Sequence, residues 1–351
     1  MSKPIRIGIA GFDHFFAALG AVREIEQNPN AQLVVAAHHD LDRIKPLAEK
    51  NGATATSDYR SVVDADIDLL ITACPTSQNA DLVIAAAQQG KHILSVKPFA
   101  MNLAQADAVV AAVEQAGVHF MSFDISWRFN PLYRKTAELL RQGAIGRPLS
   151  AFCLLRSALP AFVWFGNPFV AGRSWWLDPA QAPGGGWIDH AIYYVDVLRW
   201  LFGSEVVRVS GETARLRHPD EAQEDFGLAT LVFGNGSVAS VEVTWHVEGS
   251  GMAMAFHLVG SDGQLLSDTR MGGTPAHFST KNEARLIRFG EGSQGWQELD
   301  LPAVEGGATS HMLAVLRGEA QPLANERDAR ANLAACLAFY QAAREHCSVK
   351  L

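Results

Sequence analysis

Lys97 is a residue whose type and position suggest chemistry. It follows a short apolar run, His92 to Val96, that predicts a buried strand, and Pro98 comes directly after it. Partial burial at a strand end would lower the pKa of the lysine toward the working range. Its ammonium group could then hydrogen-bond a reacting oxygen. The alternative is a lysine whose long stem carries its charge to the surface.

A second group of candidate residues lies on one predicted helix. Tyr193 comes four residues after Asp189 and three before Asp196, so the three side chains share one helical face. A phenol normally titrates at about 10, and a nearby Lys97 cation would lower that pKa, which makes Tyr193 a candidate proton donor or acceptor. Asp189 could orient Lys97 or a substrate hydroxyl. His190 is a rival acid or base, but it points about 100° away from Asp189 on a helix.

The same residues have purely structural explanations. Tyr193 could be a core aromatic residue beside Tyr194 and Trp200, and Asp189 and Asp196 could be solvated acids on the helix surface. The two interpretations predict different exposure of the aspartate side chains, because a solvated carboxylate lies at the surface and a catalytic one lies within a site.

Arg128 and a group of aromatic residues are candidates for substrate contacts. Arg128 could bind a substrate hydroxyl or carboxylate, or it could hold a domain junction. The aromatic residues suit a pocket wall against the face of a sugar, although a core or a dimer interface is the more common use of such clusters. They are Phe162, Trp164, Phe165, Trp175, Trp176 and Trp187.

The loop after the first predicted strand is a degraded form of a dinucleotide-binding loop. The fingerprint has glycine at three places, of which only Gly11 is retained, while Asp13 and Phe16 occupy the other two. A carboxylate facing a pyrophosphate is electrostatically unfavourable unless it points away or is neutralised. Taken alone, the loop is equally compatible with an ordinary strand-to-helix turn.

The second predicted strand, Leu33 to Ala37, ends in His38, His39 and Asp40. An acid that binds the adenosine ribose is normally found here, so Asp40 in that role would favour NAD. A protonated His38 or His39 could instead favour the additional phosphate of NADP. Asp40 could also cap the helix that starts at Leu41. No metal site is expected, since no other ligand stands at a recognisable spacing from the two histidines.

Predicted strands and helices alternate over the first 120 residues, and these elements must position the candidate residues. Such alternation predicts a parallel sheet with helices on both faces, and ligands of such sheets bind at the carboxyl ends of the strands. The predicted strands cover residues 5–10, 33–37, 68–73, 92–96 and 118–123, and the predicted helices cover residues 17–27, 41–50, 80–89 and 103–116. The loops after residues 10, 37, 73 and 96 are therefore the expected binding loops.

The pattern changes after about residue 124. Turn signals at Asn235-Gly236 and Asp262-Gly263 separate apolar runs that predict an antiparallel sheet. Strands are expected at residues 206–214, 228–233, 238–245, 255–259 and 285–289, and helices at 131–142, 310–317 and 326–346. The sequence thus predicts an α/β domain of the Rossmann type over residues 1–123. An α+β domain with a large, open, mostly antiparallel sheet is predicted over residues 124–351, and its C-terminal helices may pack back on the first domain.

Composition limits the classes of function. The chain has 351 residues, of which 48% are hydrophobic and 19% charged, which suits two globular domains. A net charge of −8 without a basic tract argues against nucleic acid as a partner. The four cysteines form no C-x-x-C motif and indicate reduced thiols. Because no signal peptide or membrane-spanning run is evident, we expect a cytoplasmic protein that acts on a small molecule.

Three segments resemble the Gfo/Idh/MocA oxidoreductases. Residues 66–75 followed by 90–98 end in Val-Lys-Pro, where the family has Glu-Lys-Pro. Residues 127–131, Trp-Arg-Phe-Asn-Pro, resemble the Arg-Phe-x-Pro element that opens the second domain of the family. Residues 184–196 resemble the element Gly-Gly-x-x-x-Asp-x-x-x-His-x-x-Asp. The order and spacing of these motifs hold along essentially the whole chain.

This resemblance implies an NAD(P)-dependent dehydrogenase or reductase that transfers hydride at a carbinol carbon. The expected substrate is a sugar, an inositol or a related polyhydroxylated molecule, and NAD is slightly favoured over NADP. The implied catalytic residues are Lys97, Tyr193 and Asp189, and the implied substrate contacts are Arg128, Asp196 and Trp176. The implied dinucleotide contacts are Gly11, Phe12, Asp13, His38, Asp40, Cys74, Pro75, Asn79, Lys97 and Pro98.

The chain departs from the family pattern at four places. Besides the lost loop glycines, Asn79 replaces a common His, Val96 replaces the Glu of Glu-Lys-Pro, and Tyr193 replaces the usual His. Tyrosine at the last place is also found in the glucose–fructose oxidoreductases and dihydrodiol dehydrogenases of the family. The first three departures bear on cofactor affinity and identity more than on the fold.

Two other functions remain open on the same fold. The first is a catalytically inactive ligand sensor or regulator, as in a galactose-pathway repressor of the family. The second is an enzyme with a permanently bound cofactor that transfers hydride between two substrates. A homo-oligomer, dimer or tetramer, is expected by analogy with relatives that cover the open sheet in this way.

Overall fold

A computed structural model of the chain describes residues 3–160, 169, 174–248, 251–269, 285–290, 294–303 and 306–351. Three of the predicted pocket aromatics, Phe162, Trp164 and Phe165, lie outside these described residues. The chain forms two compact units. The first comprises Met1–Ile125, Pro160–Pro183 and Gly306–Leu333, and the second Ser126–Leu159, Gly184–Glu305 and Ala334–Leu351. The first unit therefore contains two later segments in addition to the stretch predicted from the sequence.

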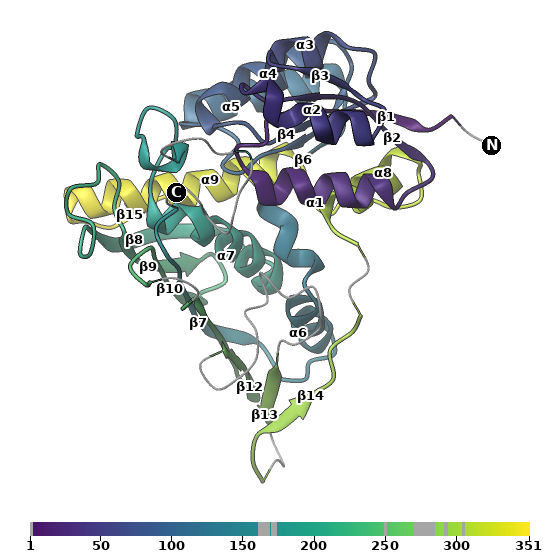
Figure 1. Cartoon of the computed structure of the whole chain (residues 1–351). Coiled ribbons are helices and arrows are strands. Elements are labelled where there is room, and N and C mark those ends of the chain that lie inside the picture. The colour runs from purple at the N-terminus through teal and green to yellow at the C-terminus, as the bar shows by residue number, and fades with distance from the viewer. Residues whose placement is uncertain are drawn as a thin grey trace. The chain divides into compact units, whose positions relative to one another are not determined.

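A six-stranded parallel sheet forms the core of the first unit (Figure 1). The strand order is β3-β2-β1-β4-β5-β6. The central strands consist of apolar residues because helices cover both faces of such a sheet. The strands are β1 (Ile5–Ala10), β2 (Ala31–Ala37), β3 (Thr54–Thr56), β4 (Leu69–Thr72), β5 (His92–Ser95) and β6 (Phe120–Ser122). The predicted Rossmann-type sheet is confirmed.

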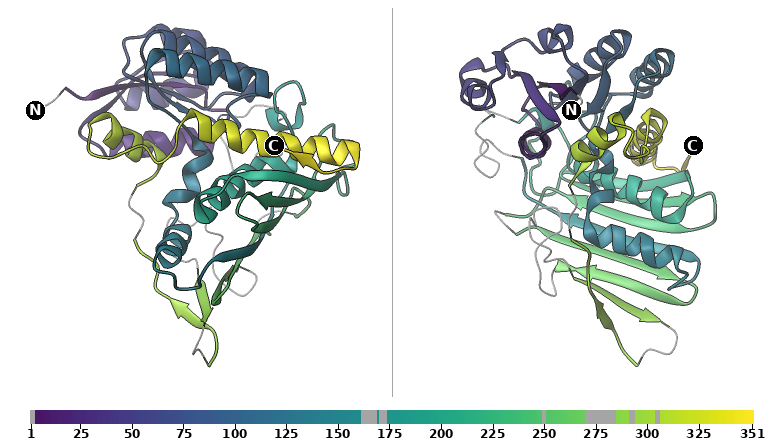
Figure 2. Two further views of the ribbon diagram at one scale, coloured as in Figure 1. Left: turned by 180° about the vertical axis from the view of Figure 1, so that it is seen from behind. Right: turned by 90° about the vertical axis from the view of Figure 1, so that its right-hand side faces the viewer.

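Helices lie on both sides of this sheet, as Figure 2 shows. They are α1 (Phe15–Glu26), α2 (Leu41–Lys50), α3 (Tyr59–Asp64), α4 (Thr76–Gln88), α5 (Leu103–Ala116) and α8 (Ala308–Leu316). Local signals fix their ends: the Asn102 side chain accepts from the backbone N–H of Gln105 at the start of α5, and Gly117 ends that helix with φ +65°. Helix α8 packs against α1, where the Glu24 carboxylate accepts the backbone N–H of Ser310 at 2.7 Å.

The second unit contains a nine-stranded sheet in the order β14-β13-β12-β11-β7-β10-β9-β8-β15. Strands β10 and β7 are parallel, and the other described pairs are antiparallel, which confirms the predicted open, mostly antiparallel sheet. The strands are β7 (Pro148–Arg156), β8 (Val206–Ala214), β9 (Phe226–Phe233), β10 (Val238–Thr244), β11 (Ala253–Gly260), β12 (Gly263–Asp268), β13 (Leu286–Gly290), β14 (Gln297–Leu299) and β15 (Val349–Lys350).

Helix α7 (Gly186–Phe202) packs against β10, β9 and β7 on one face of this sheet. Every residue from Gly186 to Arg199 is buried, because apolar side chains surround the helix and it is covered on several sides. The remaining helices are α6 (Pro131–Arg141), α9 (Glu326–Glu345) and the 3-10 helices at Phe123–Phe129 and Trp175–Leu177. None of the helices in the described part of the chain is long and apolar enough to cross a membrane.

Four of the seven predicted helix starts, at residues 41, 103, 131 and 326, are confirmed, and the other three were placed two to four residues too late. The helix predicted from Ala80 begins at Thr76, because Pro75 stands at the N-cap and the first turn is polar, without apolar periodicity. The helix predicted from Ala17 similarly begins at Phe15. Strand β13 is displaced by one residue and runs over Leu286–Gly290.

Candidate active site

A cavity of about 670 Å³ opens in the first unit beside the carboxyl ends of its strands. Residues that follow β1, β2, β3 and β4 line it, among them Asp13, His39, Tyr59, Pro75 and Ser77. In parallel α/β sheets this edge is where ligands bind. Three of the four predicted binding loops, those after residues 10, 37 and 73, therefore meet at one cavity.

The first loop makes its turn at Gly11, which has φ +94°. A Cβ atom at this position would lie 2.5 Å from the backbone nitrogen of Cys74, so only glycine fits. This close approach brings the loops after β1 and β4 together. The retained glycine thus performs the turn-forming part of the dinucleotide fingerprint.

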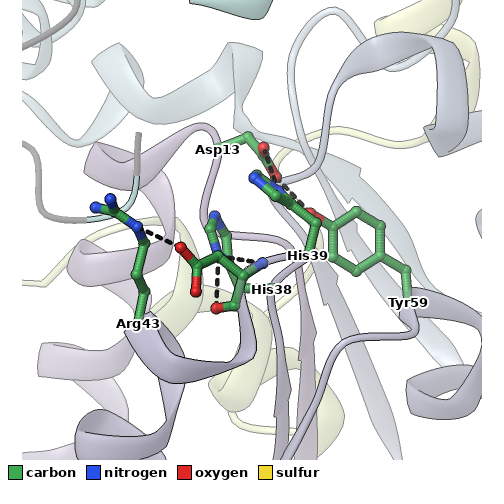
Figure 3. Close-up of polar contacts among 6 residues, drawn as sticks. Asp13, His38, His39, Arg43 and Tyr59 are labelled. Carbon is green, nitrogen blue, oxygen red and sulfur yellow. Dashed lines mark hydrogen bonds and ion pairs between the residues drawn. The ribbon is translucent and has the colours of Figure 1, made fainter. Parts of the chain in front are cut away.

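The Asp13 carboxylate, which occupies the place of the second glycine, is held by two partners (Figure 3). The Tyr59 hydroxyl donates to its Oδ2 at 2.7 Å, and His39 Nδ1 lies 3.5 Å from its Oδ1. Burial, with the neighbouring carboxylate, raises the pKa of Tyr59, so the phenol remains a donor. The hydrogen bond with Asp13 raises the pKa of His39 and favours the charged imidazole. The carboxylate is therefore neutralised locally.

His38 and Asp40, two of the predicted dinucleotide contacts, both have partners within the chain. His38 is fully buried, and its Nδ1 lies 3.1 Å from both the backbone nitrogen and the carbonyl oxygen of Asp40. Burial lowers the pKa of His38, which disfavours the protonated form considered for NADP. Asp40 stands at the N-cap of α2, but its carboxylate accepts Arg43 Nε at 2.7 Å instead of a capping N–H.

Lys97 is buried at the end of β5, with only 1% of its surface exposed. Its ammonium group lies 4.7 Å from the ring centroid of Trp176, a cation–π distance. The interpretation of Lys97 as a surface lysine is therefore wrong. The apolar strand and the indole ring remove it from water instead.

Asn79 supports the loop that carries Lys97. Its amide nitrogen donates to Ser95 Oγ at 2.8 Å and to the carbonyl oxygen of Phe99 at 2.6 Å. Thr76 Oγ1 donates to the carbonyl oxygen of Pro98 at 3.1 Å. Asn79 is fully buried, so the side chain that replaces the common family His serves as a brace in this structure.

The other predicted dinucleotide contacts differ in exposure. Pro75 lines the cavity. Phe12 and Cys74 are fully buried, and Phe12 packs against Phe169 with ring centroids 4.9 Å apart. Burial raises the pKa of the Cys74 thiol, which makes it a poor nucleophile.

In the second unit, three glycines let the start of α7 approach its neighbours. A Cβ atom at Gly184 would lie 2.3 Å from the Tyr340 ring, and one at Gly185 would lie 2.5 Å from the carbonyl oxygen of Glu224. The Glu224 carboxylate accepts the backbone N–H groups of Gly185 and Trp187, and the Tyr340 hydroxyl donates to it at 2.6 Å. Burial raises the pKa of Glu224. No sequence signal pointed to Glu224 or Tyr340, since both are distant from α7 in the chain.

Asp189 is buried on α7, with 2% of its surface exposed. Its Oδ2 accepts Trp245 Nε1 at 3.1 Å and lies 3.1 Å from His190 Nδ1. The interpretation of Asp189 and Asp196 as solvated acids is therefore wrong. His190, expected to point about 100° away from Asp189 on the helix, nevertheless has its Nδ1 beside the Asp189 carboxylate. Trp245, on the segment after β10, was not anticipated as a partner.

Tyr193 is 4% exposed and stacks on Trp127, with ring centroids 5.0 Å apart and an interplanar angle of 15°. The His190 ring lies 6.2 Å from the Tyr193 ring. Tyr194, the next residue, is fully buried and its hydroxyl donates to the carbonyl oxygen of Leu154 at 2.9 Å. Helix α7 therefore brings Asp189, His190 and Tyr193 into one group.

Arg128 and Asp196, both predicted to contact substrate, form a buried ion pair with each other. Arg128 Nε and Nη2 each donate to a different Asp196 oxygen at 2.7 Å, and the two side chains are 7% and 0% exposed. This two-pronged geometry fixes the 3-10 helix at Phe123–Phe129 against α7.

Comparisons with known proteins agree with this architecture. A model of the oxidoreductase family with an NAD-binding Rossmann fold matches residues 5–123, and a model of the GFO/IDH/MocA C-terminal domain matches residues 133–266. D-apiose dehydrogenase of Paraburkholderia graminis is 27% identical over 343 residues, which is 95% of this chain and 86% of that protein.

Two further relatives extend the comparison. The scyllo-inositol 2-dehydrogenase (NAD(+)) of Bacillus subtilis is 27% identical over 278 residues, 77% of this chain and 75% of that protein. A solved structure of levoglucosan dehydrogenase in complex with NADH and levoglucosan has a TM-score of 0.81 at 21% identity and covers 99% of both chains. The chain thus belongs to the Gfo/Idh/MocA oxidoreductase family, with an NAD(P)-binding Rossmann domain and the C-terminal domain of that family.

Proposed function

We propose that the protein is an NAD(P)-dependent dehydrogenase or reductase acting on a CH–OH group of a sugar, an inositol or a related polyhydroxylated small molecule. The observation that carries the proposal is Lys97, a lysine held 1% exposed at the carboxyl end of a parallel strand. This edge of the sheet is where the ligands of parallel α/β sheets bind, so the ammonium group is placed to meet one. The named substrates of the relatives, an apiose, an inositol and an anhydrosugar, support the substrate class.

The residues around the cavity fit a dinucleotide. Gly11, which has no Cβ atom, lets the loops after β1 and β4 approach each other closely at the edge of the sheet where a dinucleotide would bind. Asp13 is neutralised by Tyr59 and His39, which reduces its repulsion of a pyrophosphate. When bound, the nicotinamide would accept or supply the hydride.

The protein side chains would bind the hydroxyl oxygen of the substrate and transfer its proton. Lys97 would hydrogen-bond the substrate oxygen and stabilise its negative charge as it develops. Tyr193 would donate or accept the proton of that hydroxyl group. Asp189, fixed by the Trp245 indole, would orient the substrate or the acid–base group.

We propose NAD in preference to NADP. The cavity is lined by the acids Asp13, Asp58 and Asp81, together with the cations Arg60 and His39. At neutral pH this lining is more negative than positive, so it would repel the additional phosphate of NADP.

Calorimetry tests the cofactor part of this proposal. NADH should bind at least tenfold more tightly than NADPH to the purified chain. The Arg60→Glu variant should widen the difference, because it adds one more negative charge to the cavity wall. Equal or tighter binding of NADPH would contradict the preference for NAD.

Measuring the rate of substrate oxidation tests the proposed chemistry. Oxidation of a panel containing apiose, inositols, levoglucosan and aldoses should show activity that the Lys97→Met variant reduces by roughly 10²- to 10⁴-fold. Methionine preserves the length and apolar packing of the stem, so circular dichroism should be unchanged. Undiminished activity of this variant would remove Lys97 from the mechanism.

A ligand sensor on the same fold is the second candidate function. The observation that favours it is Asp13, which occupies a place where the dinucleotide fingerprint has glycine. A sensor would bind a sugar and show no turnover with any member of the panel. Release of nicotinamide nucleotide from the denatured protein would instead favour an enzyme with a permanently bound cofactor.

A further inference from the structure

Asp13, His38 and His39 converge at the carboxyl ends of β1 and β2, although Asp13 is distant from the histidines in the chain (Figure 3). One ligand atom from each of the three residues lies within 4.8 Å of the other two. The sequence pattern gave only the two adjacent histidines, which is why no metal site was expected from it. The tertiary structure supplies the third residue.

The spacing of Asp13 and His39 suits a tetrahedral ion. His39 Nδ1 lies 3.5 Å from Asp13 Oδ1. Ligands about 2.0–2.2 Å from a tetrahedral Zn²⁺ are separated from each other by roughly 3.3–3.6 Å. An ion could therefore replace the proton between these two atoms, and neither side chain would have to move far.

The other polar atoms of the Asp13 and His38 side chains, Oδ2 and Nδ1, already have partners within the chain. Tyr59 donates to Asp13 Oδ2, which leaves Oδ1 facing His39. His38 Nδ1 lies 3.1 Å from both the backbone nitrogen and the carbonyl oxygen of Asp40. A metal ion bound at Nε2 would select the tautomer in which Nδ1 donates to that carbonyl oxygen and Nε2 carries the lone pair. Metal-binding histidines usually donate their second ring N–H to a backbone carbonyl or a carboxylate in this way.

His38 Nε2 has no hydrogen-bond partner within the described parts of the chain, although the residue is fully buried. A buried imidazole nitrogen without a partner is unfavourable by about 1–3 kcal/mol. An ion bound by this nitrogen would satisfy it. An ion pair between Asp13 and His39 without a bound metal would leave His38 Nε2 without a hydrogen-bond partner.

We propose that Asp13, His38 and His39 form a binding site for a divalent transition metal ion, with Zn²⁺ as its representative. Two imidazoles and one carboxylate favour Zn²⁺, Co²⁺ or Ni²⁺ over Mg²⁺ and Ca²⁺, which prefer oxygen ligands. Three protein ligands leave a coordination position open for water. Asp13 and His39 also line the cavity, so that position is accessible to small molecules.

The test uses full-length protein without a histidine tag, stripped of metal and free of dinucleotide. Titration with Co²⁺ should give visible absorption bands of a low-symmetry site, and Zn²⁺ should abolish them. Calorimetry with Zn²⁺ should give one ion per chain. Mg²⁺ at the same concentration should bind at least a hundredfold more weakly.

Single substitutions locate the site. Asp13→Asn keeps an acceptor for Tyr59 but loses the charge, and His39→Ala removes an exposed side chain, 57% of which is accessible, so neither should unfold the protein. Each should weaken Zn²⁺ binding at least about tenfold, since even partners of metal ligands contribute 10- to 100-fold. His38→Gln should do the same if it folds.

The matched control is His119→Ala. His119 is an exposed histidine whose ring stacks on His92 at 5.2 Å, and it belongs to no three-residue cluster of the described chain. Its loss should leave Zn²⁺ affinity unchanged. Absence of Zn²⁺ binding, or binding that Asp13→Asn and His39→Ala leave intact, would overturn the proposal. Because these titrations contain no dinucleotide, neither result bears on the proposed enzymatic function.

Discussion

At the scale of single residues, Tyr193 and Tyr194 are adjacent tyrosines whose hydroxyl groups we expect to have different tasks. The Tyr193 ring stacks on Trp127, and its hydroxyl is the proposed acid–base group. Removing only that hydroxyl in Tyr193→Phe should lower kcat by roughly 10²- to 10⁴-fold. The melting temperature should change little, because the stacked ring remains.

Tyr194→Phe is the control for this substitution. The Tyr194 hydroxyl donates to the carbonyl oxygen of Leu154 in the core. Its removal should lower the free energy of unfolding by about 1 kcal/mol and leave kcat near that of the parent. Full activity of Tyr193→Phe would exclude its phenol from proton transfer.

His92 should make the stability depend on pH. Its Nδ1 accepts the backbone N–H of His119 at 3.0 Å, which requires the neutral ring, and burial together with the neighbouring His119 lowers its pKa. Below about pH 6.5 the unfolded chain therefore binds a proton that the folded chain does not, so stability falls as the pH falls through this range. Urea unfolding at pH 7.5 and 5.5 should show the loss.

His92→Gln tests the assignment, because the amide oxygen can accept the same N–H without titrating. The difference in unfolding free energy between the two pH values should be smaller in this variant than in the parent. Burial also lowers the pKa values of the buried His38 and the half-buried His311, so part of the pH dependence should remain. An unchanged difference would show that His92 does not titrate in this range.

At the scale of elements, Glu224 secures the start of α7 to the rest of the second unit. It accepts two backbone N–H groups of the helix start and the Tyr340 hydroxyl. Glu224→Ala leaves these donors buried without an acceptor, which should lower the free energy of unfolding by about 1–3 kcal/mol. Urea denaturation measures this change. Glu224→Gln retains one oxygen and should cost less, and an equal loss in the two variants would contradict this role.

The ion pair between Arg128 and Asp196 joins a 3-10 helix to α7. Arg128→Met removes the guanidinium and leaves the Asp196 carboxylate in a buried position, which should cost about 3–5 kcal/mol in unfolding free energy. The double variant Arg128→Met, Asp196→Leu should recover much of this loss, because no charge stays behind. Equal destabilisation in the single and double variants would argue against a pairwise interaction.

At the scale of the whole molecule, the face of the nine-stranded sheet opposite α7 is only partly polar. Alternation along the strands places Phe152, Leu228 and Val238 on that face, each between 36% and 39% exposed. Their inward neighbours, such as Cys153, Ala229 and Ala239, are buried. We propose that a second copy of the chain covers this face.

Light scattering should therefore give at least a dimer at micromolar concentration. Phe152→Asp places a charge within this apolar group and should shift the protein to monomers with unchanged secondary structure. Asp262→Asn, in the turn between β11 and β12, is a surface control that should leave the mass unchanged. A monomeric parent protein would count against assembly through this sheet.

The alternation of apolar strands and helices, the turn residues and the motif order determined the two-sheet architecture from the sequence. These signals are local: Gly11 makes its turn and Gly117 ends its helix wherever the rest of the chain lies. Short elements were missed for the same reason. Strand β3 and helix α3, only three and six residues long, are too short to show a period.

The tertiary structure alone decided which partners the site residues have. Asp189 meets Trp245, Arg128 meets Asp196, and Asp13 meets Tyr59 across distances of 46 to 68 residues in the chain. Sequence spacing predicts contacts only between residues a few positions apart. These contacts depend instead on which strands lie side by side and where their loops end. The sequence thus determined which chemical groups were available, whereas burial and long-range packing determined which of them are neutralised, braced or left facing a cavity.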